Sequence, residues 1–129
     1  MCQMLLSIKP EYAQLIFEGK KQYEFRKTKP QKGVDHIIFY ATFPQKQVVG
    51  EATIDKILEG SPKEIWEIAK TAAGITKDFY FSYYAEKSKA IAYRLKNVVK
   101  YDEPLTLKDL GVLSAPQSYQ YLENKWIQI

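Results

Sequence analysis

Residues 6–27, LSIKPEYAQLIFEGKKQYEFRK, place a strand, a helix and a second strand in close succession. The apolar run at 4–8 predicts a first strand that ends before Pro10, and Pro10 suits the first turn of a helix. Apolar side chains then recur at helical spacing over 10–18. Gly19 follows in the position where helices commonly end. The stretch therefore predicts a short helix that connects two strands.

The second of these strands carries both rings and charges. Tyr23 and Phe25 alternate with Glu24 and Arg26, which is the spacing of a β-strand. Successive side chains of a strand point to opposite faces. We therefore expect the two rings on one face and the acid and base side by side on the other.

The rest of the chain alternates between strand and helix patterns. β-Branched and aromatic residues indicate strands over 34–41, 48–58 and 91–101. A capping box at 61–64 begins a helix that reaches about residue 73, a second helix is expected at 76–85, and helical turns are expected at 106–110 and 118–123. No βαβ rhythm is present, so the order favours an α+β fold with a small curved sheet or β-barrel and flanking helices. With 129 residues, the chain is expected to form one domain, 1–129.

The positive charge of the protein is concentrated in its first quarter. Residues 1–33 contain seven lysines and arginines and three glutamates, a net charge of +4, whereas the remaining 96 residues contain twelve charges of each sign. A basic stretch directly after a short helix predicts an anionic partner.

Several kinds of site are excluded or disfavoured by composition. Cys2 is the only cysteine, which excludes an intramolecular disulfide and a cysteine zinc cluster, and His36 is the only histidine. The six glycines form neither a P-loop nor a dinucleotide-binding motif. We expect no metal and no cofactor. No stretch reaches the roughly 20 apolar residues of a membrane span, and no signal peptide pattern is visible, so a cytoplasmic protein is expected.

The spacing of the basic stretch resembles that of a known family. Gly19, Lys21, Glu24 and Arg26 match the pattern G-x-K-x-x-E-x-R of ASCH domains, which belong to the PUA-like superfamily. The resemblance implies a PUA-like β-barrel of five to six strands with flanking α-helices and a cleft beside the motif. It also implies that RNA or a nucleotide-like ligand binds in this cleft.

The residues of the motif are suited to bind an anion and to recognise a nucleobase. Lys21 offers a mobile ammonium group for phosphate, and Arg26 offers a planar fork for phosphate or for a base edge. Glu24 can orient that guanidinium or accept a hydrogen bond from an exocyclic amine. Lys9 is expected at the same rim, and Tyr40, at the end of a strand, is expected to line the cleft. The alternative role of the motif is a structural salt bridge that ties the helix end to the strand.

Aromatic residues crowd the segment 79–84, FYFSYY, which is too aromatic for one helix face. We expect Phe79 and Tyr83 in the core, and Tyr80 and Tyr84 covering the barrel with their hydroxyl groups in water. Rings that remain exposed beside a basic groove can stack on unpaired bases.

An enzyme is the alternative to a binding domain. Some ASCH proteins that resemble this chain are amidohydrolases of acetylated cytidine and others are ribonucleases. This resemblance implies Lys21 as the reactive amine or as the partner of an oxyanion. Those amidohydrolases place a glutamate before the aromatic segment, where this chain reads AAGI at 72–75. The catalytic carboxylate would then come from Glu51, Glu24 or Asp78, and Glu51 is the expected partner of Lys21. The family also permits a protein-interaction module or a regulator of transcription, and the sequence leaves the oligomeric state open.

Overall fold

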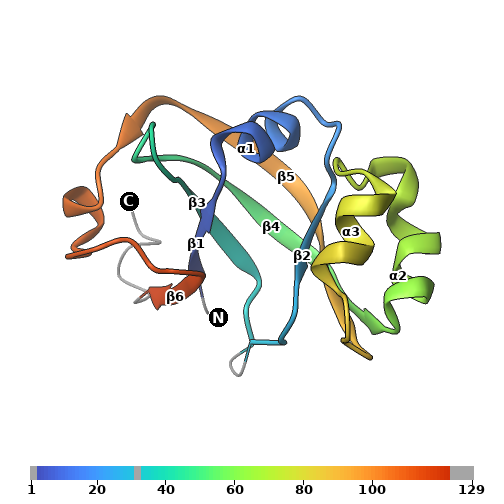
Figure 1. Cartoon of the computed structure of the whole chain (residues 1–129). Coiled ribbons are helices and arrows are strands. Elements are labelled where there is room, and N and C mark those ends of the chain that lie inside the picture. Colours follow the sequence, from blue (N-terminus) through green and yellow to red (C-terminus); the bar gives the residue numbers. More distant parts are fainter. Residues whose placement is uncertain (1–2, 31–32, 123–129) are drawn as a thin grey trace.

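The computed structural model describes residues 3–30 and 33–122. In that part of the chain, six strands form one sheet in the order β2-β5-β4-β3-β1-β6, with three α-helices against it (Figure 1). The strands are β1 (Gln3–Ile8), β2 (Tyr23–Arg26), β3 (His36–Ala41), β4 (Gln47–Gly60), β5 (Ala90–Leu105) and β6 (Tyr119–Leu122). The helices are α1 (Pro10–Phe17), α2 (Pro62–Ala69) and α3 (Lys77–Tyr83), with 3₁₀ turns η1 (Lys70–Ala72) and η2 (Lys108–Leu110).

The sheet curls into a half-barrel because its two longest strands, β4 and β5, pair irregularly. β4 has 14 residues and β5 has 16, and their pairing shifts register three times between Val48 and Lys56. Bulges bend a strand and increase its twist. β1 pairs with β3 in parallel, and the other pairs are antiparallel. β2 and β6 remain edge strands, so the barrel is open, and the predicted α+β class is confirmed.

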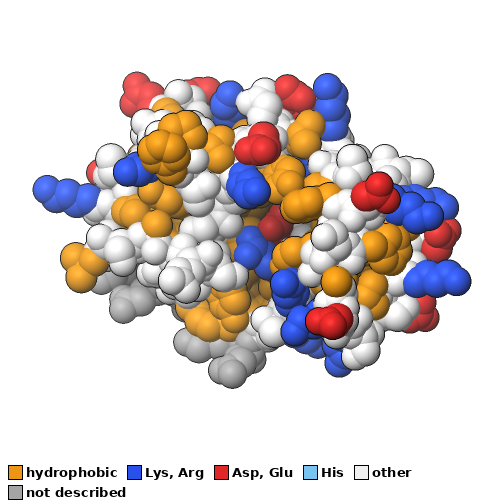
Figure 2. All heavy atoms as spheres, in the orientation of Figure 1, with side chains coloured by type: hydrophobic (Ala, Val, Ile, Leu, Met, Phe, Trp, Pro, Cys, Tyr) orange, Lys and Arg blue, Asp and Glu red, His pale blue; other side chains and the backbone are white. Residues whose placement is uncertain are grey.

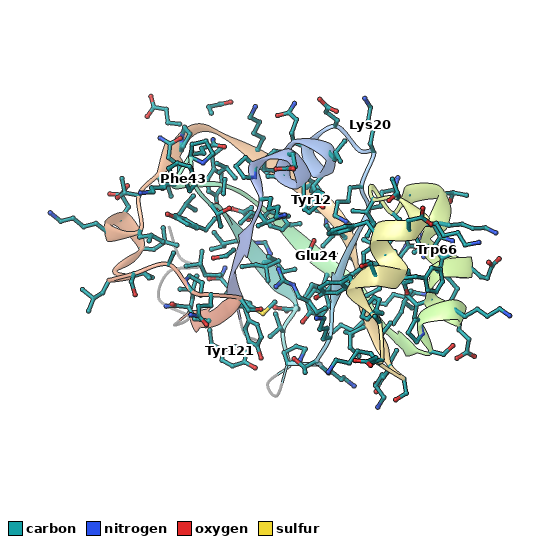
Figure 3. All side chains as sticks on the ribbon, viewed as in Figure 1. Tyr12, Lys20, Glu24, Phe43, Trp66 and Tyr121 are labelled. Carbon is teal, nitrogen blue, oxygen red and sulfur yellow. The ribbon has the colours of Figure 1, made fainter. Side chains whose placement is uncertain are left out.

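The main core lies between this sheet and α1. Leu6, Phe39 and Tyr93 are fully buried there, and Ile16 of α1 packs over them. A second cluster joins α2 and α3 to β2 and to the start of β5, on the right in Figure 1. Trp66 of α2 belongs to this cluster and is labelled at the right of Figure 3. The two clusters share strand β5, whose alternating residues belong to one cluster or the other, and β2 contributes to the second cluster.

Local capping signals set where the helices begin. The predicted capping box is present at α2: Glu64 N donates to Ser61 Oγ at 3.1 Å, and Ser61 N donates to Glu64 Oε1 at 2.9 Å. At α3, Phe79 N donates to Thr76 Oγ1 at 3.1 Å. Each cap satisfies amide groups that the first turn of a helix leaves unpaired.

Two predictions about the second half of the chain were wrong. Residues 119–122 form strand β6, which pairs antiparallel with the open edge of β1, and not a helical turn. In α3, Tyr80 and Tyr84 are buried, whereas Phe79 is exposed and Tyr83 is half-buried. The buried hydroxyl groups are satisfied by backbone carbonyls: Tyr80 OH donates to Pro62 O at 2.7 Å, and Tyr84 OH donates to Arg26 O at 2.8 Å.

Candidate functional site

A cleft of about 350 Å³ opens at the motif predicted from the sequence. The end of β1, α1, β2 and α3 each contribute side chains to its lining, which includes Lys9, Tyr12, Lys21, Glu24, Arg26 and Phe79. Figure 2 shows an acidic side chain recessed near the centre of this face, with basic side chains beside it and hydrophobic ones around. In Figure 3, Tyr12 lies below α1 and Glu24 lies between β1 and β2.

Glu24 and Arg26 form an ion pair on β2. Arg26 Nη2 lies 2.8 Å from Glu24 Oε2, as expected for neighbours on one face of a strand. The guanidinium also reaches the facing edge of the half-barrel, where Nη1 donates to Ser118 Oγ at 2.9 Å and Nη2 donates to Ser7 O at 3.2 Å. Arg26 therefore links β2 to β1 and to the segment before β6, across the opening of the sheet.

Lys21 is buried and held in place. Only 3% of its surface is exposed, and its Nζ donates to Ala73 O at 2.8 Å. The same ammonium group lies 5.4 Å from the ring centroid of Tyr12 and 4.9 Å from that of Phe25. Ring faces attract cations at such distances. Lys21 thus occupies a fixed position in the cleft wall and is not the mobile group that the sequence predicted.

Burial also changes the acidity of Lys21. Desolvation lowers its pKa, because the charged form is disfavoured away from water. The carboxylate of Glu24 opposes this effect and raises the pKa, while the Arg26 guanidinium lowers it further. Desolvation is the largest of these causes. The structure thus places an amine that loses its proton more readily than an exposed lysine next to an ion pair.

Gly74 allows Lys21 to lie in this position. Gly74 has φ +70°, and a Cβ at this residue would come within 2.5 Å of Lys21 Cβ. The neighbouring backbone adds a second link, since Gln22 N donates to Ala72 O at 2.8 Å. The turn at 72–74, which was predicted only as a helix end, therefore packs against Lys21 and fixes its position.

Aromatic side chains form the walls of the cleft. Tyr12 of α1 and Phe79 of α3 face each other with ring centroids 6.4 Å apart. Tyr83 lies farther along the same wall, and Lys27 Nζ lies 4.7 Å from its ring centroid. Lys9 is exposed at the rim, 5.9 Å from the ring centroid of Tyr12. Tyr12 was not predicted as a site residue, although it stands three residues after Lys9 on the helix that leads to the motif.

Three residues that the sequence suggested for the site lie outside the cleft. Tyr40 is buried in the cluster that packs β1 and β3 against the segment around η2, and it does not line the cleft. Glu51 lies on β4, where its carboxylate accepts a hydrogen bond from Tyr101 OH at 2.9 Å and lies 2.7 Å from His36 Nε2. Asp78 does not line the cleft either. Of the three carboxylates considered as partners of Lys21, the structure brings Glu24 to it.

Within 3–30 and 33–122, no group of three or more His, Cys, Asp or Glu side chains is placed to hold a metal ion. Among the described helices, none has the length and apolar character needed to cross a membrane.

Comparisons with known proteins agree with the fold and identify the family. The ASCH domain family model matches residues 6–104. The chain is 33% identical over 121 residues to the large ribosomal subunit protein uL22 of Ureaplasma parvum, covering 93% of this chain and 39% of that protein. It is 30% identical over 131 residues to an ASCH domain-containing ribonuclease of Zymomonas mobilis, covering 98% of this chain and 88% of the relative.

Solved structures show the same likeness. The crystal structure of ASCH from Zymomonas mobilis matches with a TM-score of 0.88 and 30% identity, over 98% of this chain and 91% of the other. The N-terminal domain of Staphylothermus marinus McrB shares the fold, with a TM-score of 0.61 and 15% identity over 98% and 91% of the two chains. The family model and the Zymomonas relatives together show that this chain belongs to the ASCH domain family.

Proposed function

We propose that this protein binds RNA or a nucleotide-like ligand in the cleft beside the G-x-K-x-x-E-x-R motif. The observation that carries the proposal is the cleft itself, because it joins buried charges, ring faces and an exposed lysine in one hollow. The ASCH relative named a ribonuclease supports RNA as the ligand class. Unpaired nucleic acid is commonly bound by positive charge combined with aromatic rings.

The charge of the cleft favours an anionic chain. Lys9, Lys21 and Arg26 contribute three positive charges and Glu24 contributes one negative charge, so these lining residues carry a net charge of +2. Lys27 extends the positive surface outward from the wall formed by Tyr83. Positive surfaces of this kind attract phosphates from a distance and orient the ligand before it makes close contacts.

The size of the cleft favours one unpaired nucleotide. Its volume of about 350 Å³ lies at the lower end of the roughly 300–1,000 Å³ of pockets for single small ligands. A base pair in a duplex cannot enter a hollow that is closed by α1 on one side and α3 on the other. Single-stranded RNA, or a free nucleotide, is therefore the expected ligand.

Binding of a fluorescent single-stranded RNA at several salt concentrations tests this proposal. We expect the affinity to fall as salt rises, with each phosphate contact contributing a slope of about 0.7 in a double logarithmic plot. Lys9→Gln should weaken binding and reduce the slope. Lys108→Gln, a change in η2, is the matched control. An affinity that does not depend on salt, or equal effects of the two substitutions, would contradict the proposal.

Cleavage of RNA is the second candidate function. It is favoured by the Zymomonas ribonuclease, which shares 30% identity with this chain over 88% of its own length. In the cleft, Glu24 is the carboxylate and Lys21 is an amine whose pKa is lowered by burial. Incubation of labelled RNA with the protein and with its Lys21→Met variant tests this candidate. If the RNA stays intact after prolonged incubation under conditions where it is bound, cleavage is contradicted and binding remains as the only proposed function.

A further inference from the structure

The guanidinium of Arg26 has little capacity left for a phosphate. Nη2 already donates to Ser7 O and to Glu24 Oε2, and Nη1 donates to Ser118 Oγ. Arginine grips a phosphate at two points through neighbouring N–H groups, and both of its usual two-point arrangements include Nη2. A phosphate at the floor of the cleft would therefore have to break the pair with Glu24 or the link across the sheet opening.

One buried donor at the same place remains without a partner among the described residues. Arg26 Nε is buried and has no hydrogen-bond partner. Glu24 makes its ion pair with Arg26 through Oε2 and not through Oε1. Glu24 is only 7% exposed. Buried donors are nearly always paired in folded proteins, so the unpaired Nε of a residue that lines an open cleft indicates where a ligand contributes an acceptor. The Glu24 oxygen that the ion pair does not use can accept from a donor on the same ligand.

The charge at the floor also discriminates between ligand groups. A phosphate would stand next to the carboxylate of Glu24, and like charges repel strongly in a site with little water. An uncharged group with a donor beside an acceptor meets no such repulsion, because its donor can face Glu24 and its acceptor can face Arg26 Nε. The edges of nucleobases carry this combination of donors and acceptors.

The walls suit the same group. The rings of Tyr12, Phe25 and Phe79 line the cleft and offer apolar surface to a flat ligand. Lys21 is held between two of these rings by its bond to Ala73 O, so its ammonium contributes positive charge without moving toward a phosphate.

We propose that the floor of the cleft, formed by Glu24 and Arg26, receives the uncharged edge of one unpaired nucleobase, while the phosphates stay at the rim beside Lys9 and Lys27. This inference rests on the RNA binding proposed above and adds the orientation of the ligand. It assigns Glu24 to recognition of the base, and it assigns the exposed lysines to the backbone.

Binding to two oligonucleotides of equal length tests this inference. One is a single-stranded RNA, and the other is its abasic counterpart, which keeps the sugars and phosphates. We expect the wild-type protein to bind the RNA about tenfold or more tightly than the abasic chain, as a stacked and hydrogen-bonded base requires. Glu24→Gln, which removes the charge and keeps the shape, should abolish most of this preference. Lys9→Gln should weaken binding of both chains by similar factors.

The alternative outcomes are distinct. Equal binding of the two chains by the wild type would overturn the inference and leave the proposed RNA binding intact. A Glu24→Gln variant that keeps the full preference, or that binds both chains more tightly, would also overturn it, the second result indicating a phosphate at the floor. If neither chain binds, the proposed function fails together with this inference. Thermal unfolding checks that the variant is folded, and if it is not, the wild-type comparison alone decides.

Discussion

Glu24 Oε2 and Arg26 Nη2 lie 2.8 Å apart on alternate positions of β2, at the edge of a sheet that does not close. Both side chains are largely shielded from water. The same guanidinium reaches Ser7 and Ser118 on the facing edge. The family motif therefore has a structural role in addition to any role in binding, because it connects the two sides of the half-barrel.

Replacing Arg26 with leucine should destabilise the protein and loosen the segment that leads into β6. Removing one partner of a largely buried ion pair typically costs about 3–5 kcal/mol, since the other charge remains buried without compensation. Chemical denaturation measures the loss, and amide hydrogen exchange at 118–122 should accelerate. Lys29→Ala is the control, because its contact with Glu59 is exposed and such pairs contribute at most about 1 kcal/mol. Equal losses in the two variants would contradict this role of Arg26.

Gly74→Ala should weaken ligand binding as well as stability. Gly74 and Gly111 both have positive φ values, +70° and +72°, which cost an alanine roughly 1 kcal/mol. Only at Gly74 does a Cβ collide with a neighbour, because it comes within 2.5 Å of Lys21 Cβ, whereas at Gly111 nothing lies within 4 Å. Gly111→Ala therefore reports the backbone cost alone. RNA affinity should fall in the first variant and not in the second, and equal affinities would show that the position of Lys21 does not matter.

The sequence allowed the frame of this fold to be predicted because its elements have local signals. Alternating residues mark β2, and the Ser61–Glu64 capping box marks α2, as the structure confirms. β6 has only a brief alternation, in which Tyr119 and Tyr121 flank Gln120, and this short pattern was interpreted as a helical turn. Its four residues become a strand because β1 presents an open edge to pair with, and that edge exists only in the folded sheet.

The candidate site was predictable in position and less so in geometry. The spacing of Glu24 and Arg26 correctly placed both on one face of β2. The burial of Lys21 depends on Gly74, which stands more than fifty residues later, and no local pattern reveals that contact. The orientation of α3 was predicted incorrectly because carbonyl groups at Pro62 and Arg26 accept the hydroxyl groups of its tyrosines, which permits these to be buried.

Phe79→Ala should reduce RNA affinity because Phe79 lines the cleft with 45% of its surface exposed. Stacking of a base on an aromatic ring contributes about 1–3 kcal/mol, so the dissociation constant should rise by roughly fivefold to over a hundredfold. Phe43→Ala is the matched control, since Phe43 is 76% exposed and does not line the cleft. Fluorescence anisotropy measures both. A larger loss from Phe43→Ala would place the RNA at the turn between β3 and β4 instead.

The lowered pKa of Lys21 predicts a pH dependence of stability. In the unfolded chain Lys21 keeps its proton up to its ordinary pKa of 10.5, whereas in the folded protein burial makes it lose the proton at lower pH. Between these two pKa values the unfolded state binds more protons, so the Lys21 contribution to the free energy of unfolding rises with pH and becomes constant above 10.5.

Buried tyrosines lower the free energy of unfolding in the alkaline range. The effect of Lys21 must therefore be measured as a difference between two proteins. Burial raises the pKa of Tyr80 to about 12, so ionisation of the unfolded chain lowers stability once the pH passes the ordinary value of 10.0. Because this effect is common to both proteins, the difference in unfolding free energy between wild type and Lys21→Met isolates the lysine. That difference should shift in favour of the wild type as the pH rises toward 10.5. Lys20→Met, at the exposed neighbouring position, controls for the loss of one positive charge. A difference that stays constant with pH would show that Lys21 titrates alike in the folded and unfolded states.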